Sequence, residues 1–262
     1  MHPQTFQATN LSEIKACRHA FWGRRGGSSR DSKGRPDDFN TGFLHAEDKS
    51  EPIENRTTAM ANLHSPAPAL VTPKQIHSAT VHVVEEPWDN LAAPDGDAVV
   101  TNQPGLAMGI LTADCGPILF CDPKNRVVAA THAGWRGAEA GITGLTVEAM
   151  ESLGAERSFI HAALGPCIAQ ASYEVGPEFY DAFLAKDSQN IRHFVPSAKE
   201  DHWMFDLKAF IRTELDALNL GSIEIMSQDT CADDLNFFSH RYNTLNKLPE
   251  FGRQLSAICL SD

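Results

Sequence analysis

Short apolar runs separated by turn-forming residues follow one another from residue 74 onward, and this pattern is typical of buried β-strands. PILFC (117–121) and VVAATHA (127–133) flank DPKNR, a turn-forming sequence, and therefore predict a β-hairpin. Further apolar runs predict strands over 78–86, 97–101, 106–112, 158–164, 222–228 and 254–260.

Apolar positions recur at helical spacing in other segments. In GITGLTVEAMESLG (141–154) they lie three or four positions apart, and Gly154 suits the left-handed conformation that ends many helices. Pro177 near the start of 176–186 is tolerated in a first helical turn. The same reasoning predicts helices over 51–63 and 205–221.

Two segments predict loops, because 23–40 is rich in Gly, Ser and Arg and 64–73 carries three prolines. The helices are inserted irregularly among many strands, which favours an α+β fold with mixed sheets over strict βαβ repetition. We find no internal repeat and no low-complexity segment. We therefore predict one domain over residues 1–262.

Charge and composition narrow the class of protein. The formal net charge of −12 disfavours nucleic acid as a partner, so an anionic substrate would need a local cationic pocket. No apolar run approaches the 20 residues of a membrane span, and the N-terminal residues do not resemble a secretory signal. Six cysteines without a Cys-x-x-Cys pair fit reduced thiols, so we expect a cytoplasmic protein.

A polar break at Thr112–Cys115 separates two of the predicted strands. The hairpin places Cys115 and His132 at the same edge of a sheet, away from the connecting turn. A thiol beside an imidazole indicates either a nucleophile and its base or two metal ligands. A third ligand would decide between these, and His77 is the strongest candidate, whereas His82 lies within a predicted strand. Spacing alone leaves both possibilities open.

Several stretches resemble the YfiH or laccase-domain (polyphenol oxidase) family, also described as purine nucleoside phosphorylases. They are KQIHSATV, DGDAVVTN, MGILTADCGPILFCD, AATHAGWRG, LGPCIAQASYEVG, DTCADDLNFFSHR and GRQLSAI. TADC together with HAGWRG at this separation is a highly specific signal. The resemblance implies a layered α/β/β/α sandwich.

The resemblance also implies a function and an active site. His77, Cys115 and His132 would be the catalytic residues and would bind one zinc ion, or copper. The implied activities are phosphorolysis of adenosine, inosine, guanosine and methylthioadenosine, and deamination of adenosine. A purine nucleoside and phosphate would then be the partners of a monomer or small homo-oligomer.

The N-terminal motifs of the family are altered in this chain. GRRGGSS keeps Arg24 but has Gly23 in place of Thr, and NTGFLHAE keeps Asn40 but has Leu44 at a His position and Ala46-Glu47 in place of Gly-Asp. QIHS has Ser78 where glycine is usual. We predict that Arg24, Arg25 and Asn40 contact substrate, with the two arginines holding phosphate on a glycine-rich loop. The alternative is a solvated basic loop.

Two other functions compete with this prediction. A metal-free cysteine hydrolase using Cys115 and His132 would act as an amidase on a peptidoglycan precursor. A multicopper phenol oxidase would need a type-1 copper site and a histidine-rich trinuclear cluster. The 11 histidines include no His-x-His pair, which argues against the oxidase. Asp114, Arg136 and Arg241 are further candidates for the pocket, or for structural pairing.

Overall fold

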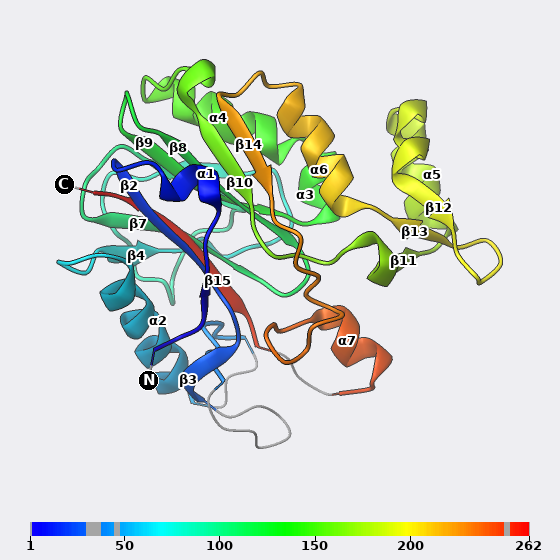
Figure 1. The fold of residues 1–262 in the computed structure, drawn as a ribbon, viewed down its shortest axis with the longest axis horizontal. Helices are drawn as coiled ribbons and strands as arrows, with labels where there is room; N and C mark the ends of the chain where they lie inside the picture. Colours follow the sequence, from blue (N-terminus) through cyan, green and yellow to red (C-terminus); the bar gives the residue numbers. More distant parts are fainter. Residues whose placement is uncertain (1, 30–37, 45–47, 249–251, 262) are drawn as a thin grey trace.

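The computed structural model describes residues 2–29, 38–44, 48–248 and 252–261. Two mixed β-sheets pack face to face, and helices cover their outer faces (Figure 1). The first sheet has the order β1 (Thr5–Phe6), β2 (Cys17–Trp22), β15 (Gln254–Leu260), β7 (Leu106–Thr112) and β4 (Ala69–Val71). The second has the order β14 (Ser222–Ile225), β10 (His161–Leu164), β8 (Gly116–Asp122), β9 (Val127–Ala133), β6 (Ala98–Thr101) and β5 (Val81–Val83). The predicted layered α+β fold with mixed sheets is confirmed.

The helices belong to different layers. On the outer side of the first sheet lies α2 (Ser50–Leu63), whereas α3 (Trp135–Glu139), α4 (Ile142–Ser152) and α6 (Leu207–Asp216) pack on the second sheet. Two short helices are α1 (Thr9–Ser12) and α7 (His240–Leu245). A lobe at one side contains α5 (Pro177–Lys186) and a small sheet of β11 (Glu174–Val175), β13 (Trp203–Phe205) and β12 (Phe194–Pro196) (Figure 1).

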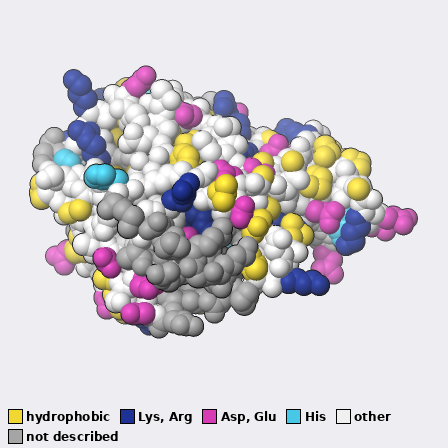
Figure 2. Space-filling model, turned by 60° about the horizontal axis from the view of Figure 1, so that its bottom comes forward, with side chains coloured by type: hydrophobic (Ala, Val, Ile, Leu, Met, Phe, Trp, Pro, Cys, Tyr) yellow, Lys and Arg dark blue, Asp and Glu magenta, His cyan; other side chains and the backbone are white. Residues whose placement is uncertain are grey.

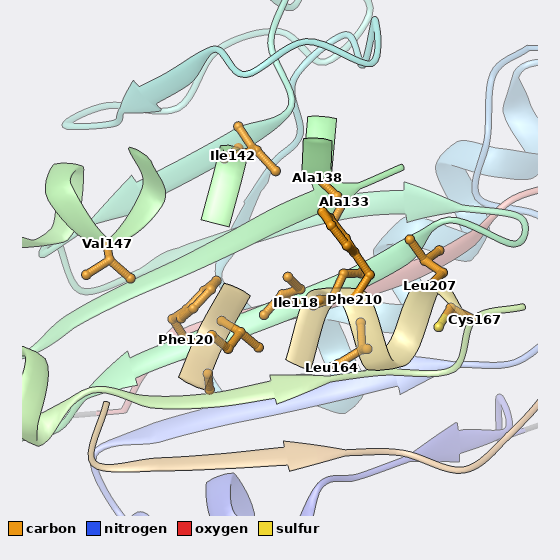
Figure 3. Packing of buried hydrophobic residues seen from close by; sticks show 14 of the residues in the cluster. Ile118, Phe120, Ala133, Ala138, Ile142, Val147, Leu164, Cys167, Leu207 and Phe210 are labelled. Atoms are coloured by element: carbon orange, nitrogen blue, oxygen red, sulfur yellow. The ribbon is translucent and has the colours of Figure 1, made fainter. Parts of the chain in front are cut away.

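Strands buried on both faces explain the continuous apolar runs in the sequence. Side chains of a strand point alternately to opposite faces, so Ile118 and Phe120 of β8 pack under the helices while Leu119 and Cys121 face the first sheet. Figure 3 shows Ile118 and Phe120 with their helical neighbours, which include Ile142, Val147 and Phe210. The core therefore lies in three layers, two of them between sheet and helix.

Most elements agree with the sequence, and two loop predictions are partly wrong. The predicted hairpin forms with β8 antiparallel to β9, and Gly154 has the expected left-handed φ of +96°. However, β3 (Arg25–Ser29) lies inside the predicted loop 23–40, and β4 lies inside the predicted loop 64–73. Strand β4 is stabilised by pairing with β7, a contact between distant segments that local composition does not report. Residues 30–37 of the first loop lie outside the described residues.

His19 of β2 is a buried histidine that is held neutral. The N–H of Ala8, at the start of α1, donates to His19 Nε2 at 3.0 Å, and a protonated ring would have no acceptor to offer. Burial lowers the pKa of His19 from 6.5 to about 4, although Glu224 opposes the shift. The unfolded chain therefore binds a proton more readily than the folded one between these two values.

We predict that the free energy of unfolding falls as the pH drops from 6.5 to 4, by about 3 kcal/mol from this residue. The loss has this sign because protonation of His19 in the unfolded state favours unfolding. Urea unfolding at a series of pH values, in the wild type and in His19→Gln, measures it. The glutamine variant, which does not titrate, should show a shallower slope; equal slopes would contradict the assignment.

Candidate metal centre

The thiol and the two imidazoles come together at one edge of the second sheet. Cys115 directly precedes β8, and β8 pairs with β9 so that Pro117 lies opposite His132. His77 reaches the same point from the segment between β4 and β5. The three ligand atoms all lie within 4.8 Å of one another, and Cys115 Sγ is 3.9 Å from His77 Nε2. The juxtaposition predicted from the hairpin therefore occurs.

The donor set and its spacing fit a single zinc ion. Zinc bonds to sulfur at about 2.3 Å and to nitrogen at about 2.0–2.1 Å, so tetrahedral ligands lie about 3.6 Å apart. The 3.9 Å between Cys115 Sγ and His77 Nε2 is close to that value. Three protein ligands leave a fourth position open, as in catalytic rather than structural zinc sites. Copper also binds such nitrogen and sulfur ligands.

Asp97, which the sequence analysis did not single out, fixes both histidines. Its carboxylate is fully buried and accepts five hydrogen bonds. Two of them come from the backbone N–H of His77 (3.0 Å) and from the ring Nδ1 of His132 (2.8 Å). The bond to Nδ1 leaves His132 Nε2 for the cluster. Ser78 donates both its N–H (2.6 Å) and its hydroxyl (2.7 Å). The hydroxyl is supplied where the family pattern usually has glycine.

The charges of the cluster reinforce one another. Burial raises the pKa of the Cys115 thiol, but His132 and His77 outweigh burial and lower it to about 6. Burial lowers the pKa of His132, but Cys115 and Asp97 outweigh it and raise it to about 9. For Asp97 the hydrogen bonds from His132 and Ser78 outweigh burial and lower the pKa to about 2. The thiolate is both the metal-binding and the nucleophilic form of cysteine.

The backbone around the cluster is held in uncommon conformations. His77 and Asp114 have φ values of +60° and +87°, in the left-handed region that non-glycine residues seldom adopt. The buried Asp114 carboxylate accepts hydrogen bonds from the Thr230 hydroxyl (2.7 Å) and the Arg241 N–H (2.6 Å). These bonds fix the turn that presents Cys115. The candidate role of Asp114 is therefore that of an anchor for this turn.

Gly134 lies against the cluster. A Cβ atom at this position would lie 2.9 Å from His77 Cδ2 and 3.1 Å from Cys115 Sγ. The space beside the cluster is thus available only to glycine, which explains part of the HAGWRG motif.

The cluster opens into a cavity of about 980 Å³. The aromatic residues Trp135 and Tyr173 are among those that line it. Among its described lining residues the cations are Lys49, Arg56, Lys74, Arg136, Arg241 and Arg253, and the sole carboxylate is Asp114. Figure 2 shows Lys and Arg side chains at the centre of one face of the molecule. In a chain with a net charge of −12, this cavity is locally positive.

The predicted phosphate-binding arginines lie elsewhere. Arg24 is buried and pairs with Asp38 at 2.9 Å, and Arg25 is exposed on β3; neither is among the residues that line the cavity. Asn40 Oδ1 accepts hydrogen bonds from the N–H groups of Gly42 and Arg253, both of which line the cavity. Asn40 thus fixes the backbone of two residues that line the cavity.

Other candidates fall into place around the cavity. Arg136 and Arg241, which were candidates either for the pocket or for structural pairing, line the cavity. Leu44 also lines it. The altered positions Ala46 and Glu47 lie outside the described residues.

In the described part of the chain, no helix is long and apolar enough to cross a membrane.

The chain is similar to several known proteins. A family model described as multi-copper polyphenol oxidoreductase laccase matches residues 18–261. A purine nucleoside phosphorylase of Rickettsia conorii is 32% identical over 212 residues, which cover 81% of this chain and 86% of that protein. One of Pseudomonas aeruginosa is 34% identical over 226 residues, covering 86% and 87%. The crystal structure of YfiH from Bacillus licheniformis superposes with a TM-score of 0.87 at 26% identity, covering 99% and 97%.

Proposed function

The chain belongs to the multi-copper polyphenol oxidoreductase laccase family, and on that premise we propose that it is a zinc-dependent purine nucleoside phosphorylase. Relatives that carry the name purine nucleoside phosphorylase match most of the chain. The substrates would be a purine nucleoside and phosphate, and the protein would act in the cytoplasm.

The observation that carries the proposal is the positive cavity beside His77, Cys115 and His132. Of the six cations among its described lining residues, Lys74 pairs with Asp95 at the surface. The other five, against one carboxylate, favour an anion such as phosphate. The carboxylate of Asp114 already accepts hydrogen bonds from the Thr230 hydroxyl and the Arg241 backbone N–H, so it is less available to neutralise the charge of the cations. A nucleoside without phosphate would leave these charges unused.

The reaction exchanges one bond for another at C1′ of the ribose. The bond from C1′ to the purine nitrogen breaks and its electron pair stays with the base, while an oxygen of hydrogenphosphate bonds to C1′. The proton that the phosphate loses is taken up by the base. Cationic side chains hold the attacking phosphate and orient it, which accounts for much of the rate in such a transfer. The aromatic lining residues Trp135 and Tyr173 suit contact with a purine ring. When bound, zinc would supply a Lewis acid next to the cavity.

The test is adenosine turnover by the zinc-loaded protein with and without phosphate. We expect release of adenine and ribose 1-phosphate that requires phosphate, and no release after removal of the metal by a chelator. The chelated protein reloaded with zinc is the control and should recover activity. Adenine release that does not depend on phosphate would contradict the proposal.

Adenosine deamination is a second candidate, because three protein ligands leave a metal position open to water. It replaces the 6-amino group by oxygen and releases ammonia, with no need for phosphate. The same assay identifies it, since inosine formed without phosphate would mark deamination. The unused positive charge of the cavity makes phosphorolysis the better-supported reaction.

A further inference from the structure

Arg56 of α2 is a buried arginine whose described contacts are all with neutral groups. The residue is 6% exposed to solvent. Its Nε donates to the Thr41 carbonyl at 2.7 Å, and its Nη1 donates to the Thr72 hydroxyl at 3.2 Å. The guanidinium lies 4.0 Å from the centre of the Phe43 ring. These contacts fix the group in place without neutralising its charge.

Other arginines of the chain show that a carboxylate partner is easily provided. The buried Arg24 pairs with Asp38, and the more exposed Arg157 pairs with Glu151. The chain has 34 acidic residues and 22 basic ones, so carboxylates are not scarce. Burial lowers the pKa of Arg56 to about 9, which shows that its surroundings penalise the charge. An unneutralised buried charge is costly unless a further group compensates it.

Arg56 is in the wall of the cavity, where a ligand can supply that compensation. Thr41 links it to Arg253: the Thr41 carbonyl accepts from Arg56, and the Thr41 N–H and hydroxyl donate to the Arg253 carbonyl. Arg253 lines the same cavity, and burial lowers its pKa as well. Thr41 thus ties the guanidinium of the buried Arg56 to the backbone of the half-buried Arg253.

We propose that Arg56, assisted by Arg253, binds a phosphate group in the cavity that both residues line. The inference rests on the proposed function for the identity of the anion. The phosphate group has two possible sources, which are inorganic phosphate as the second substrate and the phosphoryl group of a nucleoside monophosphate. Fixed, planar guanidinium groups suit the oxygens of either one.

The experiment is calorimetric titration of the full-length protein with inorganic phosphate, adenosine 5′-monophosphate and adenosine. Arg56→Met should weaken the binding of the phosphate-bearing ligand about 10- to 100-fold and leave adenosine unchanged. Arg56→Lys keeps a charge in the buried site and should fold even if the methionine variant does not; it should weaken binding less. Arg212→Met is the matched control, because Arg212 pairs with Asp216 on α6, away from the cavity lining.

The two ligands distinguish the sources. Tight binding of inorganic phosphate that is lost in the Arg56 variants assigns the site to the second substrate. Tight binding of the monophosphate alone, lost in the same variants, assigns it to a nucleotide. If the wild type binds neither ligand, or if Arg56→Met and Arg56→Lys bind as the wild type does, the inference is overturned.

Binding and turnover separate this inference from the proposed function. If Arg56-dependent phosphate binding occurs but no adenine is released from adenosine, the proposed function fails and the phosphate site stands. If adenine is released while the Arg56 variants bind phosphate normally, the phosphate site fails and the proposed function stands.

Discussion

Replacing Cys115 with alanine is expected to remove the bound zinc and to lower kcat/KM for phosphorolysis on the order of 10³-fold or more, while the protein stays folded. Cys115 supplies the single sulfur ligand of the cluster, and its position between β7 and β8 is not fully buried, so the change leaves the core intact. Metal content per chain, adenine release and circular dichroism measure the three parts of this result. His132→Ala should give the same loss of metal.

Two further variants make the Cys115 experiment specific. Cys231→Ala removes a buried thiol that lies outside the cluster of His77, Cys115 and His132, and it should keep one zinc per chain. Cys115→Asp supplies an oxygen ligand for zinc but no nucleophilic thiol. Partial metal and partial activity in Cys115→Asp support the metal ligand. A Cys115→Ala protein that keeps stoichiometric zinc would instead show that Cys115 is not a metal ligand.

Asp97→Asn is expected to weaken zinc binding about 10- to 100-fold and to destabilise the fold by at least about 2 kcal/mol. The buried carboxylate accepts five hydrogen bonds, and an amide has only one oxygen to accept them. An amide NH₂ facing His132 Nδ1 would also favour the tautomer whose Nε2 carries the proton. That tautomer cannot bind a metal through Nε2.

Competition with a chromogenic chelator measures the zinc affinity, and urea unfolding measures the stability. Asp95→Asn is the matched control, because Asp95 lies two residues away but is exposed and pairs with Lys74 at the surface. Its zinc affinity should equal that of the wild type. A wild-type zinc affinity in Asp97→Asn would show that the histidines are positioned without the carboxylate.

The sequence predicts those parts of the site that depend on local pattern. A turn sequence between two apolar runs is enough to bring Cys115 and His132 to one edge, because register in a hairpin follows from the turn. The helices of the second layer follow from apolar spacing in the same way. His77 was found by resemblance and by its place at the start of a strand.

The remaining features depend on contacts between distant segments. Asp97 appears in the sequence as one acid among 34 acidic residues, and its role depends on segments 20 and 35 positions away. Arg24 was singled out as part of a basic loop, whereas the carboxylate that pairs with it is 14 positions further on. In the sequence Arg56 looks like an ordinary helical arginine, and its hydrogen bonds to Thr41 and Thr72 become visible only in the fold. Pairing and burial of this kind leave no periodic signal.

The position of β15 has a consequence for how the chain is made. This strand, Gln254–Leu260, is buried at every residue and lies between β2 and β7 in the first sheet. A ribosome adds roughly 5–20 residues per second, so β2 and β7 wait roughly 10 s or more for the strand that joins them. Until then two apolar edges are open to pairing with other chains. On a polysome, neighbouring nascent chains present the same open edges, so pairing between chains competes with the insertion of β15.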